Sequence, residues 1–199
     1  MEEMFIMLTR IANRISVLLE NYGIIETSNI EVYAYGLELF FMKTGLYLIV
    51  LCLSLITHSL IISLFFVIAY IALRQYTGGF HCSTALRCIL VSLLMFNIMV
   101  VIYKINLHFI FDILFLMSVC GLIVIIVHSP IESPNKPLTL MEARRYRRIS
   151  IVLSISLFLV SAVCWAFHIV EVYYPISYAL LADSILLLLE EGKNEKKDP

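Results

Sequence analysis

A short polar stretch between two long apolar runs carries the residue types that could do chemistry. Residues 74–90, Arg-Gln-Tyr-Thr-Gly-Gly-Phe-His-Cys-Ser-Thr-Ala-Leu-Arg-Cys-Ile-Leu, contain two arginines, a histidine and two cysteines. Polar residues kept at a membrane boundary are functional candidates, because a charged side chain at the bilayer centre costs roughly 2.5 to 3.5 kcal/mol on insertion scales. Thiolate is the reactive form of cysteine, and an imidazole is the usual side chain that generates it near neutral pH. The stretch therefore indicates nucleophilic chemistry.

The spacing of His81 and Cys88 sets a condition on the local structure. On one continuous helix, seven residues separate two side chains by about 10.5 Å along the axis, which is too far for a hydrogen bond. A direct pair requires a helix to start between them, so that His81 lies on the preceding loop and folds back over the first turns. Gly78 and Gly79 supply the permissive backbone for this. The alternative is that the two residues are unrelated, because a cysteine and a histidine seven residues apart in a membrane protein commonly have no connection.

Other side chains of the stretch leave alternatives open. Cys82 competes with Cys88 as the nucleophile because it adjoins His81, but neighbouring side chains point in different directions, which favours Cys88. Arg74 could hold a carboxylate or a developing oxyanion. It could equally be a basic anchor at the cytoplasmic end of a helix. We expect Arg87 to extend to the membrane interface.

The composition places these residues in a polytopic membrane protein. The chain has 199 residues, of which 61% are hydrophobic and 15% charged, and its mean hydropathy is +0.96. One crossing takes about 20 apolar residues, so this length permits several crossings but no large soluble domain. We therefore expect a single integral membrane domain, residues 1–199, folded as an all-α helix bundle. Its start lacks the features of a signal peptide, so we expect it to be retained.

The apolar runs predict about six transmembrane helices within residues 46–189. Residues 46–73 form two short crossings with a polar turn at 57–59, and further crossings follow at 86–103, 109–127, 151–170 and 174–189. Each half of the first run has only about 14 residues, so one tilted helix is the alternative for this run. The candidate catalytic loop at 74–88, a basic cytoplasmic loop at 128–150 and a polar tail at 190–199 complete the plan.

Residues 1–42 are expected to form amphipathic helices before the bundle. Apolar side chains recur at spacings of three and four over residues 4–22. Ser28-Asn-Ile-Glu31 is typical of a capping box and predicts a second helix toward Phe41. The two helices either lie along the membrane surface or pack on the bundle.

The basic residues predict the orientation. With six crossings and the N-terminus inside, Lys104 alone among the 14 lysines and arginines falls outside. Since basic residues collect on the cytoplasmic side, we expect both termini and the loop at 74–88 to be cytoplasmic. A five-crossing plan would export the four arginines of residues 144–148 or those near the N-terminus. We expect the loop at 128–150, with its three prolines, to be solvated or interfacial and to attract anionic lipid.

The remaining titratable residues do not form an obvious site. Asp183 lies midway along the last predicted crossing, where it could orient His81, pair with an arginine or make an interhelical contact without a catalytic part. Asp112 is expected to be interfacial. The other histidines lie near predicted helix ends on both sides, and no HExxH motif is present, so we expect no metal and no other cofactor. The five cysteines form no CxxC pair, which argues against a disulfide framework.

The pattern Arg74-x-x-x-Gly78-Gly79-Phe80-His81-x6-Cys88, followed by Asn135-Lys136-Pro137-Leu138 and a basic stretch, resembles the AgrB family (accessory gene regulator protein B) over nearly the whole chain. AgrB-like proteins are membrane cysteine endopeptidases of the bacterial cell membrane that process the AgrD pro-peptide into a cyclic autoinducer for quorum sensing. The resemblance implies that Cys88 is the nucleophile and His81 the base. Arg74 matches a further functionally important arginine, and Cys82 is not part of the pattern.

The resemblance also implies a reaction and partners. An AgrD-like pro-peptide would be cleaved through an acyl-enzyme thioester, and a cysteine or serine of the peptide would then close a thiolactone or lactone ring. The alternative is a non-enzymatic transporter or exporter of a small peptide, in which Asp183, Asn97 and histidines line a path. An exporter should tolerate alanine at Cys88, whereas a peptidase cannot. Besides the peptide and the lipid bilayer, a small bundle is compatible with a homodimer, and no nucleic acid is expected.

Overall fold

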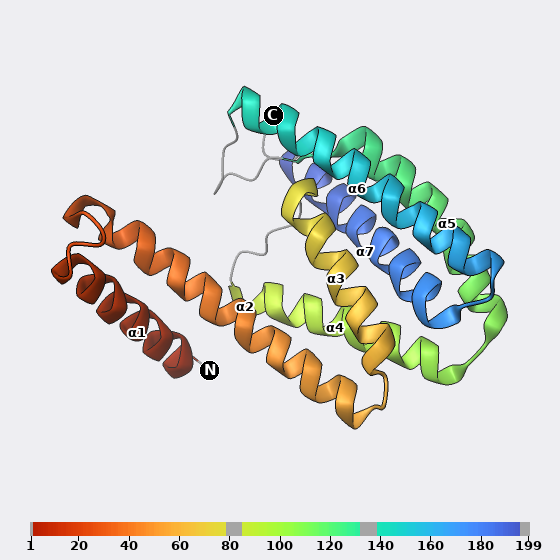
Figure 1. Cartoon of the computed structure of the whole chain (residues 1–199), viewed down its shortest axis with the longest axis horizontal. Coiled ribbons are helices and arrows are strands. Elements are labelled where there is room, and N and C mark those ends of the chain that lie inside the picture. The colour runs from red at the N-terminus through yellow and green to blue at the C-terminus, as the bar shows by residue number, and fades with distance from the viewer. Residues whose placement is uncertain (1, 79–84, 132–138, 196–199) are drawn as a thin grey trace. The chain divides into compact units, whose positions relative to one another are not determined.

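The regular structure of this protein is helical throughout the part that the computed structural model describes, which is residues 2–78, 85–131 and 139–195 (Figure 1). These ranges hold seven α-helices, a short 3₁₀-helix and an isolated bridge between Gly78 and Ile131. The elements are α1 (Glu2–Asn21), η1 (Thr27–Asn29), α2 (Ile30–Ile56), α3 (Leu60–Thr77), α4 (Ala85–Ile105), α5 (His108–His128), α6 (Leu140–Ala166) and α7 (Val170–Glu195). The expected all-α class is confirmed.

Six of these helices, α2 to α7, are long and apolar enough to cross a membrane. This confirms the multi-pass architecture with six crossings. The apolar run over residues 46–73 is broken as predicted, because α2 ends at Ile56 and α3 begins at Leu60. The Thr57 hydroxyl closes the end of α2 by donating to the Leu53 carbonyl at 2.7 Å, and His58 makes the turn with a φ of 48°.

The N-terminal part differs from the sequence-based plan. The amphipathic α1 is present, but the predicted second surface helix ending near Phe41 is wrong, since α2 runs without a break from Ile30 to Ile56. The segment contains no proline, and its isolated glycines each cost a helix only about 1 kcal/mol, so nothing in it ends the helix. Ser28 lies in η1, where its hydroxyl donates to the Glu26 carboxylate.

Two compact units divide the chain, Met1–Cys52 and Leu53–Pro199. In the second unit, α7 is the most buried crossing and packs against α3, α5 and α6 (Figure 1). Gly121 allows α5 to approach α7 closely, because a Cβ there would lie only 3.2 Å from the Leu180 carbonyl oxygen. Small residues at such contacts are a common basis of helix packing in membranes. The candidate site residues all belong to this second unit.

Two helices extend beyond their predicted ends. The expectation that residues 128–150 form a loop is wrong for its second half, because α6 begins at Leu140 and carries the four arginines on its first turns. A capping box explains this start: Thr139 accepts from the Glu142 backbone N–H, and the Glu142 carboxylate accepts from that of Thr139. The prolines at 134 and 137 lie outside the described residues. Likewise α7 continues to Glu195, so the start of the expected polar tail is helical.

Candidate functional site

The described members of the candidate site lie at one end of the second unit. Arg74 is on the last turn of α3, Gly78 follows that helix directly, and Cys88 is on the first turn of α4. The Cys88 side chain is partly exposed. The described part of α4 begins at Ala85, three residues before Cys88. His81 itself lies outside the described residues, as do Gly79 and Cys82.

Gly78 occupies a position that only glycine fits. Its φ is 74°, in the left-handed region that side chains disfavour. A Cβ at this position would also overlap the carbonyl oxygen of Ile131. The same segment is tied to α3 by the Ile131 amide, which donates to the Thr77 carbonyl at 3.0 Å. The chain leaving α3 is therefore held against the segment that follows α5.

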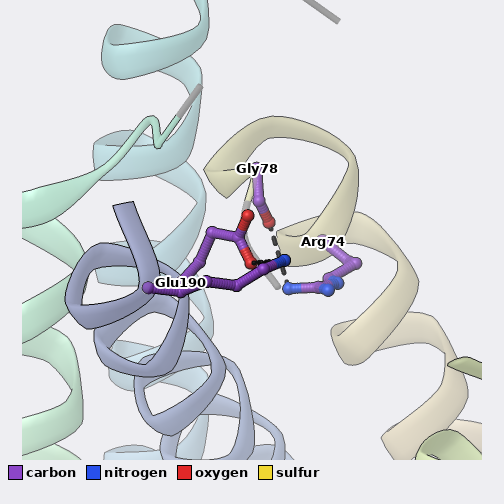
Figure 2. A network of polar contacts seen from close by, with 4 residues as sticks. Arg74, Gly78 and Glu190 are labelled. Atoms are coloured by element: carbon purple, nitrogen blue, oxygen red, sulfur yellow. Dashed lines mark hydrogen bonds and ion pairs between the residues drawn. The ribbon is translucent and has the colours of Figure 1, made fainter. Parts of the chain in front are cut away.

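Arg74 is part of a polar network that joins α3 to α7. Its guanidinium donates from Nη1 to the Gly78 carbonyl at 3.1 Å. In Figure 2, the side chains of Arg74 and Glu190 extend toward each other from their two helices. Glu190 is only 1% exposed and lies 3.5 Å from the Lys193 ammonium. The network thus combines buried or half-buried charges of both signs beside the end of α3.

Asp183 is the second buried carboxylate of α7 at this end. It is fully buried, and its Oδ1 accepts from the Thr77 hydroxyl at 3.2 Å. Arg74 lies within range of a favourable charge interaction with it. The described contacts of Asp183 therefore correspond to two of the roles expected from the sequence, an interhelical hydrogen bond and an interaction with an arginine.

Tyr70 connects these groups to the cysteine. Its hydroxyl interacts electrostatically with both Arg74 and Asp183. It also interacts with Cys88 and with Ser92, which lies one turn further along α4. Residues four apart share a face of a helix, so Cys88 and Ser92 lie on the side of α4 that faces Tyr70. Electrostatic interactions of Tyr70 therefore link Arg74, Asp183 and Cys88 in one neighbourhood.

Three members of this neighbourhood were missed by the sequence analysis: Tyr70, Thr77 and Glu190. Glu190 had been assigned to the polar tail. A signal for it exists, because it follows Asp183 by seven residues and therefore returns to nearly the same helix face if α7 continues for two more turns. Tyr70 and Thr77 carry no such signal, since their roles depend on which helix α3 packs against.

Polar groups elsewhere in the second unit are engaged in structural contacts. At the other end of α7, Asp112 accepts from the Trp165 indole at 2.9 Å and from the Tyr173 hydroxyl at 3.2 Å. Near the candidate site, His128 Nδ1 lies 2.7 Å from a carboxylate oxygen of Glu191. Within residues 2–78, 85–131 and 139–195, no three His, Cys, Asp or Glu side chains gather closely enough to hold a metal ion.

Comparison with known proteins identifies the family. The family model of accessory gene regulator B matches residues 10–188. Accessory gene regulator protein B of Staphylococcus aureus strain bovine RF122 / ET3-1 is 25% identical over 124 residues, which are 62% of this chain and 61% of the relative. The protein of strain JH9 is 24% identical over the same shares. That of strain Newman is 22% identical over 128 residues, 64% of this chain and 67% of the relative.

These alignments span about three fifths to two thirds of the relatives' length. No solved structure matches the chain. The family model, in contrast, covers nearly the whole chain, including α2 to α6 and most of α7. The chain therefore belongs to the accessory gene regulator B family.

Proposed function

We propose that this protein is a membrane cysteine endopeptidase that processes an AgrD-like pro-peptide in the accessory gene regulator system. The observation that carries the proposal is the position of Cys88, a partly exposed thiol near the start of a membrane-spanning helix. It interacts electrostatically with Tyr70, which also interacts with Arg74 and Asp183. Family membership supports the involvement in this regulatory system. A thiol among convergent polar groups at the end of a helix bundle is a suitable place for nucleophilic attack on a peptide.

The proposed reaction has two stages. The His81 imidazole takes the proton of the Cys88 thiol, and the thiolate attacks a peptide carbonyl carbon of the substrate. The C–N bond then breaks, the amine of the C-terminal fragment leaves with the proton from the imidazolium, and the N-terminal part remains as a thioester on Cys88. In the second stage, a thiol or hydroxyl of the peptide attacks that thioester, which closes the ring and restores the Cys88 thiol. When the attacking group is a thiol, this step is an exchange between two thioesters and is nearly neutral in energy.

Arg74 is suited to stabilise negative charge in this reaction. The Gly78 carbonyl fixes one side of its guanidinium, and the side chain extends toward Glu190 of α7 (Figure 2). A planar cation held in this way can bind a carboxylate of the substrate or the oxyanion that develops on the attacked carbonyl. Tyr70 and Asp183, which interact with Arg74, would line the same side of the site.

The proposal includes the orientation in the membrane. The distribution of lysines and arginines supports a cytoplasmic position for both termini, for Arg74 and for Cys88. A substrate made in the cytosol would then reach the thiol directly.

Co-expression with the cognate AgrD-like peptide, in a host that lacks both proteins, tests this function. We expect wild type to shorten the peptide and to form a hydroxylamine-sensitive adduct, and Cys88→Ala and His81→Ala to do neither. Cys164→Ala, on α6, is the matched control for loss of a cysteine elsewhere, and Cys82→Ala tests the competing nucleophile. Undiminished processing by Cys88→Ala would refute the peptidase and favour transport of a peptide processed by another enzyme.

A further inference from the structure

A hydrogen bond between two fully buried side chains fixes α7 to the end of α3. Asp183 and Thr77 are both 0% exposed, and the Thr77 hydroxyl lies 3.2 Å from Asp183 Oδ1. Asp183 Oδ2 has no hydrogen-bond partner among the residues that the structure describes. A buried carboxylate that leaves one oxygen unsatisfied lowers stability, so this contact is not explained by stability alone.

Thr77 is the point at which three segments meet. Its hydroxyl also lies 3.0 Å from the Leu73 carbonyl of its own helix, and its backbone carbonyl accepts from the Ile131 amide. The last turn of α3 is therefore held from one side by α7 and from the other by the segment after α5. Thr77 is the last residue of this helix, so the contact is made at the end of α3.

Arg74 lies three residues before Thr77 and shares its helix face. Both the backbone position of Arg74 and the Gly78 carbonyl to which it donates depend on this last turn. Asp183 is in addition within range of a charge interaction with Arg74. Tyr70, one turn earlier on α3, interacts electrostatically with Arg74, Asp183 and Cys88, which links the contact to the thiol.

We propose that Asp183, acting through Thr77, is a positioning residue that holds the Arg74 guanidinium in place for the reaction at Cys88. This inference rests on the proposed peptidase function. Asp183 touches no reacting atom in this assignment. It sets the last turn of α3 and contributes a negative charge toward which the guanidinium is drawn.

The variants can be chosen so that folding is preserved. Thr77→Val and Asp183→Leu are close in shape to the native side chains, and combining them removes both polar partners, so that neither is left buried alone. Thr77→Ser keeps the hydroxyl and serves as the rescue variant. Ser177→Ala is the matched control, because it removes another buried interhelical hydrogen bond of α7, the 2.8 Å contact with Ser161.

Cleavage of the AgrD-like peptide by purified full-length protein in vesicles is the main measurement. We expect the Asp183→Leu/Thr77→Val double variant to unfold at a temperature close to that of wild type but to cleave with kcat lowered about 10- to 100-fold, the range that a small misplacement of a catalytic group produces. Thr77→Ser should recover most of the rate. Ser177→Ala should show no comparable loss of kcat per folded molecule.

A kinetic cycle with Arg74→Lys separates positioning from general support of the fold. If Asp183 acts through Arg74, adding the Asp183→Leu and Thr77→Val changes to Arg74→Lys should lower the cleavage rate little further. In the otherwise wild-type protein, the double variant should divide its loss between kcat and KM in the same proportion as Arg74→Lys does. Equal losses in both backgrounds would overturn the inference, and so would a wild-type rate in the double variant.

Hydrogen exchange gives a readout that does not require cleavage. Amides at the end of α3 should exchange faster in the double variant than in wild type and Ser177→Ala, and unchanged exchange there would overturn the inference. If wild type and Cys88→Ala process the peptide alike, the peptidase function fails instead, and the role of Asp183 in cleavage fails with it. The two failures are therefore distinguishable.

Discussion

Gly78 lies so close to Ile131 that no side chain fits between them, and this contact fixes the path of the chain as it leaves α3. The residue also has a φ of 74°. Both constraints act on Gly78, and the carbonyl of this residue accepts a hydrogen bond from the Arg74 guanidinium. Glycine at this position therefore supports the site through the backbone.

Replacing Gly78 with alanine should disrupt the end of α3. The left-handed conformation costs a non-glycine residue about 1 to 2 kcal/mol, and relieving the overlap with the Ile131 carbonyl should cost about 1 to 3 kcal/mol more. We expect a lower unfolding temperature in detergent and loss of peptide cleavage. Gly36→Ala is the control, because nothing lies within 4 Å of a Cβ there. An unchanged unfolding temperature for Gly78→Ala would contradict the geometry.

Adjacent glutamates on α7 should respond differently to alanine. Glu190 is buried in the network with Arg74 and Gly78, whereas the Glu191 side chain is 39% exposed and pairs with His128. Removing a buried hydrogen-bonding carboxylate should cost about 1 to 3 kcal/mol, whereas removing a partly exposed polar contact should cost at most about 1 kcal/mol. Thermal unfolding and cleavage rates of Glu190→Ala and Glu191→Ala test this. Equal effects would show that Glu190 has no special role.

The crossings could be predicted because run lengths of apolar residues follow from the thickness of the bilayer. The ends of the helices could not, since a helix continues past the apolar run until a residue ends it. Thus α2 is one continuous helix through residue 42, where the sequence changes from polar to apolar, and α7 continues to Glu195. The start of α6 was predictable in principle, because Thr139 and Glu142 have the spacing of a capping box.

The candidate site was predictable only where residue type alone indicates chemistry. Arg74 and Cys88 stand out because a cation and a thiol are unusual next to apolar runs. Tyr70 and Thr77 do not, since neither residue type by itself indicates chemistry at a membrane boundary. Their importance comes from the packing of α3 against α7, which no local pattern reveals.

The membrane orientation can be tested with single cysteines in a background without the native ones. Leu107→Cys and Phe167→Cys place a thiol at exposed positions of the turns before α5 and after α6. Leu140→Cys places one at the exposed start of α6, the opposite end of that helix. A membrane-impermeant maleimide applied to intact cells should label the first two and spare the third. Labelling of Leu140→Cys alone would show that the bundle is inverted and that Cys88 faces outward.

Variants of Asp112 and Asp183 should distinguish an aspartate that supports the fold from one that positions a group of the site. Asp112 accepts from both Trp165 and Tyr173 through Oδ1. Asparagine offers the same acceptor, so Asp112→Asn should keep both bonds, while Asp112→Ala leaves two donors without their partner and should cost about 1 to 3 kcal/mol. Trp165 is the one tryptophan in the chain, so its fluorescence reports directly on this contact.

We expect Asp112→Ala to shift the tryptophan emission and lower the unfolding temperature, but to cleave the peptide normally per folded molecule. Asp183→Leu with Thr77→Val should do the reverse, because Asp183 interacts with Arg74 and lies ten residues along α7 from Tyr173, the partner of Asp112 on that helix. A loss of cleavage in Asp112→Ala that matches the Asp183 variant would mean that the two ends of the bundle act together in the reaction. Normal cleavage in both would leave each aspartate with a role in folding alone.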